Sequence, residues 1–76
     1  MDGTITLAQE SRFQMMDRQG AVHLFTLSPH AAAEPAQLAP LAAWQARVRV
    51  KYRPGDNVLA AVAEAIYVEP GSGVGP

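Results

Sequence analysis

Residues 47 to 53 read Arg-Val-Arg-Val-Lys-Tyr-Arg and alternate charged with apolar side chains over their whole length. Alternation with a period of two is the pattern of a β-strand that has one buried face and one solvated face. We therefore predict a strand over this stretch, with Val48, Val50 and Tyr52 facing inward. Its outer face then carries four of the six lysine and arginine residues of the chain, namely Arg47, Arg49, Lys51 and Arg53.

The preceding part of the chain predicts a meander of three strands. Alternating segments cover residues 4–9, 12–16 and 21–27, and polar residues separate them. Gly20 ends the second polar break, where it can adopt the positive φ angle that closes a tight hairpin. The same alternation places Ile5 with Leu7 on one face of the first strand, and Phe13 with Met15 on one face of the second.

Residues 30–45 predict a short helical connection. This segment is rich in alanine and is interrupted by Pro35 and Pro40. Pro35 suits the first turn of a helix, whereas Pro40 argues against one long helix because proline lacks an amide donor. We expect one or two helical turns that pack on the end of a barrel through three side chains at spacings of three, Leu38, Leu41 and Trp44.

Residues 58–68 allow two interpretations. Their alanines and the spacing of Leu59, Val62 and Ile66 favour a helix. A sheet of four strands, however, would leave exposed edges that a fifth strand can cover. We predict the strand and keep the helix as the alternative. The glycine- and proline-rich residues 70–76 then form a flexible tail after a single domain of residues 1–69.

Three strands, a short helical connection and two further strands are the element order of the OB-fold, a five-stranded Greek-key barrel. Over residues 3–69 the chain resembles a minimal member of this class, and it is similar to small bacterial barrel proteins of unassigned function. The resemblance rests on the element order, on Gly20 and on the pattern of residues 47–53. It implies a mostly β, five-stranded OB-like barrel and the binding site usual for that fold, but it implies no activity.

The composition limits how such a small domain is stabilised. A chain of 76 residues buries only about 60% of its unfolded surface, and cysteine is absent. Disulfides and thiolate metal sites are therefore unavailable, and His23 and His30 are poorly spaced for a shared metal. We predict no metal and no cofactor, and we regard a second copy of the chain as a candidate source of stability.

The sequence also predicts the compartment. No run approaches the roughly 18 apolar residues of a membrane span. The first residues, Met1-Asp2-Gly3-Thr4, lack the basic region and apolar core of a secretory signal. We therefore expect a cytoplasmic protein without a membrane partner.

Catalysis finds little support among these residues. The carboxylates form no close pair in the sequence, no serine, histidine and acid suggest a triad, and no glycine-rich loop joins a strand to a helix. We therefore predict a non-enzymatic binding module for a partner protein or for a second copy of the chain. Its contact surface would be an edge strand or the aromatic and methionine face of the second and third strands. Met15 and Met16 point to opposite faces, so at most one of them is exposed.

The alternative function is weak binding of single-stranded nucleic acid. Alternate residues of a strand lie about 6.6 Å apart, so the four cations of residues 47–53 form a basic stripe that can follow a phosphate backbone. The formal net charge of −1 opposes this function, and Glu64 and Glu69 are placed to neutralise the stripe from the neighbouring strand.

Stacking side chains for bases would come from an aromatic face formed by Phe13, His23 and Phe25. If Val22, Leu24 and Thr26 fill the core, His23 and Phe25 form a stacking pair on the surface. If instead Phe25 and Leu27 fill the core, His23 lies at the rim of the barrel.

Overall fold

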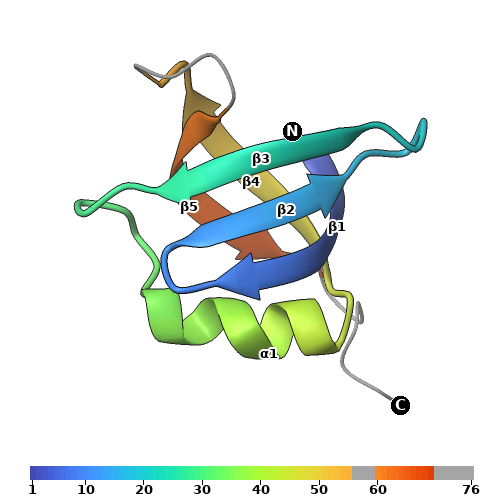
Figure 1. Cartoon of the computed structure of the whole chain (residues 1–76), viewed down its shortest axis with the longest axis horizontal. Coiled ribbons are helices and arrows are strands. Elements are labelled where there is room, and N and C mark those ends of the chain that lie inside the picture. The colour runs from blue at the N-terminus through green and yellow to red at the C-terminus, as the bar shows by residue number, and fades with distance from the viewer. Residues whose placement is uncertain (56–59, 70–76) are drawn as a thin grey trace.

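The computed structural model describes residues 1–55 and 60–69 and shows a barrel of five strands with one short helical segment (Figure 1). A 3-10 turn, η1 (Pro35–Gln37), runs into a short helix, α1 (Leu38–Ala43), between the third and fourth strands. The predicted mostly β fold and its element order are confirmed. The strands are β1 (Asp2–Gln9), β2 (Arg12–Met16), β3 (Val22–Leu27), β4 (Arg47–Arg53) and β5 (Ala61–Val68).

The ambiguous segment before the C-terminus forms a strand over residues 61–68. These residues pair with both β3 and β4, so the helical alternative is wrong for them. Residues 58 and 59, and the predicted tail 70–76, lie outside the described residues.

The strands close into a barrel in the order β1-β2-β3-β5-β4, and β4 returns to pair with β1. All neighbours are antiparallel except β3 and β5, which are parallel. Closure gives each of the five described strands a partner on both sides. The closure is short at two places, because β1 pairs with β4 only over residues 2–4 and β3 pairs with β5 only over residues 25–27. The predicted contact through an edge strand therefore stays a prediction, and the closed barrel limits it to the remaining residues of β1 and β3.

Stacked phenylalanine rings form the centre of the core. The rings of Phe13 and Phe25 lie 5.1 Å apart between centroids, with an angle of 18° between their planes. Leu38 of α1 is fully buried and belongs to the same apolar cluster. The other large core side chains come from four strands: Ile5, Met15, Leu27, Val48 and Val50.

Two aromatic side chains lie nearer the surface than predicted. Tyr52 was predicted to face inward, and its ring does meet Phe25 edge-on at 5.6 Å. The side chain is nevertheless 44% exposed, because Tyr52 lies near the end of β4, beside a register shift. Trp44 is 54% exposed, whereas Leu38 is buried and Leu41 half-buried. Three residues of a helix cover about 300°, so each step of three drifts by about 60° and carries Trp44 away from the buried stripe.

A β-bulge in β1 reverses the predicted direction of Leu7. Ile5 pairs with Met15 and Leu7 pairs with Gln14, so Thr6 is an extra residue opposite β2. Ile5 is fully buried, but the bulge turns Leu7 outward and leaves it 60% exposed. The prediction that Ile5 and Leu7 share a face is therefore wrong.

A second bulge lies in β5. Lys51 pairs with Ala65 and Tyr52 pairs with Ala63, so Glu64 is the extra residue here. The bulge shifts the register by one residue, so Ile66 lies opposite the buried Val50. Ala63 and Ala65 are nevertheless both buried, one on each side of Glu64.

Candidate functional site

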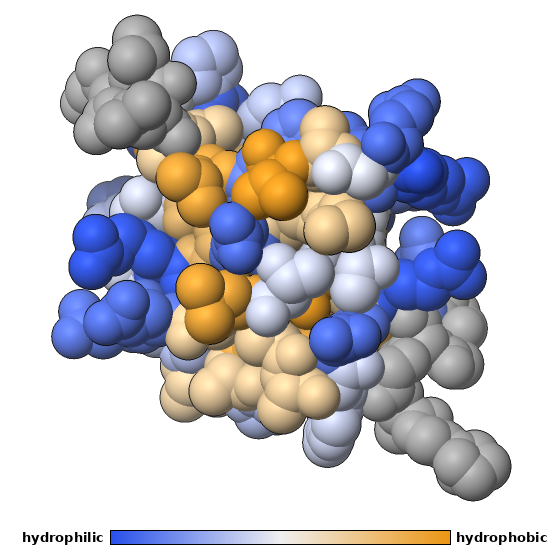
Figure 2. All heavy atoms as spheres, turned by 45° about the vertical axis from the view of Figure 1, so that its right-hand side comes forward, coloured by the Kyte–Doolittle hydropathy of each residue, from blue (hydrophilic) through white to orange (hydrophobic). Residues whose placement is uncertain are grey.

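Four large aliphatic side chains are exposed on the outer face of β1, β2 and β3. The strand register aligns Leu7, Gln14 and Leu24 in one row, and Met16 and Val22 in the next. Figure 2 shows hydrophobic side chains gathered over one face of the barrel, with more polar ones among them. We call the outer surface of these three strands the aliphatic face, and its exposed members are Leu7 (60%), Val22 (51%), Leu24 (49%) and Met16 (41%).

A groove of about 490 Å³ runs along one side of the aliphatic face. Leu7 and Leu24 contribute apolar walls, and Gln14 lies between them in the register. A third row, formed by Gln9, Arg12 and Thr26, closes the groove with polar groups. Arg12 is the one charged side chain among the described lining residues. The face is therefore nearly neutral, and it suits an apolar partner with a few hydrogen-bonding groups.

The predicted aromatic face does not exist as a surface. Phe13 and Phe25 are only 3% and 2% exposed, because they supply the largest apolar volume of the core. The apolar side chains that point outward from β3 are Val22 and Leu24. The prediction of a surface stacking pair at His23 and Phe25 is therefore wrong, and the alternative with Phe25 and Leu27 in the core is confirmed. For the methionines, Met15 is buried and Met16 is exposed, as predicted.

His23 lies at the rim of the barrel and belongs to a hydrogen-bonded turn between β2 and β3. Its Nε2 lies 2.8 Å from Oδ2 of Asp17. The other carboxylate oxygen of Asp17 accepts the backbone N–H groups of Gln19 and Ala21, each at 2.9 Å. The hydrogen bond with His23, followed by the one from Ala21, holds the pKa of Asp17 below its ordinary value. These contacts explain the position of His23 as part of the turn that Gly20 completes at a φ of 84°.

We expect the stabilising effect of Asp17 to be present at neutral pH and lost in acid. Because folding lowers the pKa of Asp17, its contribution is complete above the ordinary value of about 3.9 and disappears as the pH falls through the folded value. Asp17→Asn should therefore lower the thermal midpoint at about pH 7 and have a much smaller effect at about pH 2. Thermal unfolding followed by circular dichroism measures both, with Glu10→Gln as a control in another turn. An equal deficit at both pH values would contradict the role of the charge.

The predicted basic stripe is exposed along its full length. All four of its cations, Arg47, Arg49, Lys51 and Arg53, point away from the core on β4. The residues paired with three of them on β5 are uncharged, because Arg49 lies opposite Tyr67, Lys51 opposite Ala65 and Arg53 opposite Val62.

Two acidic groups approach the stripe near Arg49. Nε of Arg49 donates to Oδ1 of Asp2 on β1 at 2.9 Å. This hydrogen bond lowers the pKa of the Asp2 carboxyl and raises the pKa of the Arg49 guanidinium, to which Glu69 adds a smaller effect. Asp2 was not predicted as a partner, since only the pairing of β1 with β4 brings residues 2 and 49 together. Glu64 lies at the bulge, outside the register of pairs that face the stripe.

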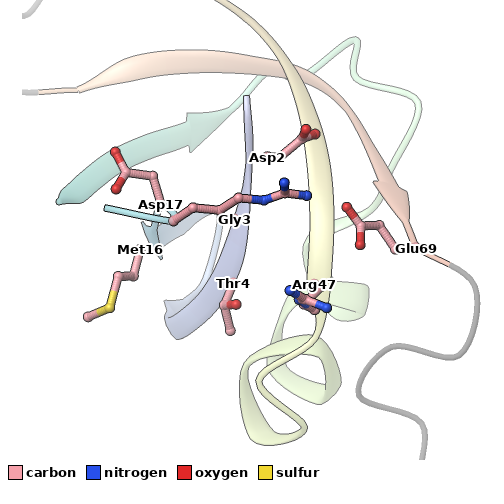
Figure 3. Close-up of a pocket in the computed structure, with 8 residues that line it drawn as sticks. Asp2, Gly3, Thr4, Met16, Asp17, Arg47 and Glu69 are labelled. Atoms are coloured by element: carbon pink, nitrogen blue, oxygen red, sulfur yellow. The ribbon is translucent and has the colours of Figure 1, made fainter. Parts of the chain in front are cut away.

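A small charged pocket of about 290 Å³ lies between these groups and the turn that contains Asp17. Figure 3 shows the carboxylates of Asp2 and Glu69 on the two sides of β4, with Arg47 at its start. Guanidinium groups of Arg18 and Arg47 line the same pocket as these carboxylates. Positive and negative groups are therefore mixed around it, so that the pocket favours neither an anion nor a cation.

The described residues provide no cluster of three or more histidine, aspartate or glutamate side chains that is placed to hold a metal ion. In the same part of the chain, no helix has the length and apolar character needed to cross a membrane.

Together, the strand order and the helical connection define a small closed β-barrel of five strands, consistent with an OB-like fold, that carries an exposed aliphatic face and a separate cationic strand. No family model, curated protein or solved structure matches the chain.

Proposed function

We propose that this chain is a non-enzymatic interaction module that associates with a second copy of itself through the aliphatic face. The observation that carries the proposal is the exposure of Leu7, Met16, Val22 and Leu24 on three adjacent strands of a 76-residue domain. A contiguous apolar patch on a small domain is typical of an interaction site. By analogy of fold, OB-folds also bind their ligands over the second and third strands.

A second copy is the occupant that best fits the chemistry of this face. A two-fold contact brings each patch against the same patch, so the patch must not repel itself. The central row is neutral, and the amide of Gln14 both donates and accepts hydrogen bonds. The chain also has no cysteine, which leaves association as a route to added stability.

The size of the face predicts weak association. Three strands spaced by about 4.8 Å and three rows spaced by about 6.8 Å span a patch well below the roughly 800 Å² that each partner buries in a standard interface. We therefore expect a reversible dimer with a dissociation constant of roughly micromolar or weaker.

Sedimentation equilibrium of the purified chain over a wide concentration range tests the proposal. The wild type should move from monomer towards dimer as its concentration rises, whereas the double variant Leu7→Gln/Leu24→Gln should stay monomeric. Association should weaken by at least roughly tenfold in that variant, because two leucines that are 60% and 49% exposed in the monomer would no longer bury apolar surface.

Val68→Gln is the matched control, because Val68 is 44% exposed on β5, outside the aliphatic face. It should associate like the wild type. A wild type that stays monomeric at the highest concentration would overturn self-association. An equal loss of association in the Val68 variant would overturn the assignment of the contact to the aliphatic face.

A further inference from the structure

We propose that the outer face of β4 and β5 is a binding site for single-stranded nucleic acid, in which Arg49, Lys51 and Arg53 contact phosphates and Tyr67 stacks on a base. This site is separate from the aliphatic face. Figure 1 shows β4 and β5 behind β1–β3, so a dimer formed through the aliphatic face leaves the site of each copy exposed.

The cations of β4 are arranged as an open track. Alternate residues of a strand repeat at about 6.6 Å, which keeps Arg49, Lys51 and Arg53 in one file. Within residues 1–55 and 60–69, Lys51 and Arg53 form no ion pair. Their cross-strand partners, Ala65 and Val62, are small and neutral. A sugar–phosphate chain can therefore approach these two cations without meeting a carboxylate among their partners on β5.

Tyr67 supplies the aromatic ring for this site, on β5 instead of the predicted second and third strands. It is 56% exposed and lies directly opposite Arg49 in the pairing of β4 with β5. A ring beside a line of cations is the combination that binds single strands without sequence readout, because every base offers a face for stacking. The bulge at Glu64 shifts the register of β5 by one residue, and the shifted register pairs Tyr67 with the outward-facing Arg49.

Asp2 orients the guanidinium of Arg49 without blocking access to it. The carboxylate accepts from Nε at 2.9 Å, and the Arg49 side chain keeps 69% of its surface exposed. Its terminal amino groups can still donate to a phosphate, because a guanidinium carries five donors. Asp2 and Glu69 lower the local charge at this end, so the site should bind weakly and depend strongly on salt.

The test is the fluorescence anisotropy of a labelled oligothymidine titrated with the full chain at several salt concentrations. The wild type should show saturable binding, and the logarithm of its association constant should fall with the logarithm of salt at a slope of about −2 for three phosphates. Arg49→Gln/Lys51→Gln should reduce the size of that slope by about 1.4. Tyr67→Ala should weaken binding by about tenfold with the slope unchanged, and Tyr67→Phe should retain binding.

Arg12→Gln/Arg18→Gln is the matched control, because it removes the same charge from residues outside the stripe. It should bind like the wild type, and so should Leu7→Gln/Leu24→Gln, which separates this site from self-association. Absence of saturable wild-type binding at low salt would overturn the proposal. Equal losses in the Arg49/Lys51 variant and the Arg12/Arg18 control would do so as well, and so would full binding by Tyr67→Ala.

Discussion

Phe25→Ala is expected to remove about 3–5 kcal/mol from the free energy of unfolding, the usual result of deleting a buried aromatic ring. Phe25 is 2% exposed and meets two other rings, stacking on Phe13 at 5.1 Å and meeting Tyr52 edge-on at 5.6 Å. A domain of this size is stable by roughly 0.05–0.15 kcal/mol per residue, so the loss removes a large part of the margin, and nearly all of it at the lower end of that range. Urea denaturation followed by circular dichroism measures it.

Phe25→Leu is a milder substitution at the same position. It keeps most of the apolar volume and removes the ring contacts, so we expect a loss of about 1–1.5 kcal/mol. If Phe25→Ala proves too unfolded to measure, Phe25→Leu still gives a midpoint. A loss below about 1 kcal/mol in Phe25→Ala would show that Phe25 does not lie in the core.

Gly3→Ala is expected to destabilise the barrel by about 1–3 kcal/mol through crowding. A Cβ atom at Gly3 would lie 2.5 Å from the carbonyl oxygen of Met16 and 2.9 Å from Cγ of Met15. The side chain of Met15 can adjust, but the carbonyl belongs to β2 and cannot move without disturbing the pairing of β1 with β2. Thermal and urea unfolding of the variant measure the effect.

Gly20 provides the contrast for Gly3. Its φ is 84°, and a Cβ atom added at this position would meet nothing within 4 Å, so the requirement for glycine here is conformational. Asparagine tolerates this region of φ, and Gly20→Asn should therefore be nearly neutral, whereas Gly3→Asn should be as harmful as Gly3→Ala. Equal stability of the two asparagine variants would refute steric crowding at Gly3.

The predictions of the fold were correct where a residue pattern fits only one kind of local structure. Residues 47–53 alternate over seven positions, and the structure forms β4 over that range. The turn at Gly20 follows from local chemistry, because the positive φ that closes a hairpin is most easily adopted by glycine. Local patterns of this kind predicted the first four strands and the helical connection, whereas the fifth strand was predicted from the edges that a four-stranded sheet would leave exposed.

The aromatic site was wrong because β3 has apolar residues on both faces. Val22 and Leu24 alternate with His23, Phe25 and Leu27, so a period of two does not say which set is buried. The set of side chains with the larger apolar volume fills the core more densely, and Phe25 and Leu27 therefore face inward. Val22 and Leu24 therefore lie on the outer surface of β3, where they form part of the aliphatic face.

The sequence by itself determined the first four strands, the turn at Gly20, the short helical connection and the basic stripe, since each depends on neighbours within a few residues. The strand state of residues 61–68 was settled by their pairing with β3 and β4. Only the tertiary structure decided which residues the two candidate surfaces present. The bulge at Thr6 turns Leu7 onto the aliphatic face, and the bulge at Glu64 turns Tyr67 towards the basic stripe. A bulge shifts the register by one residue, and register is set by the pairing of strands distant in sequence, so no local pattern records it.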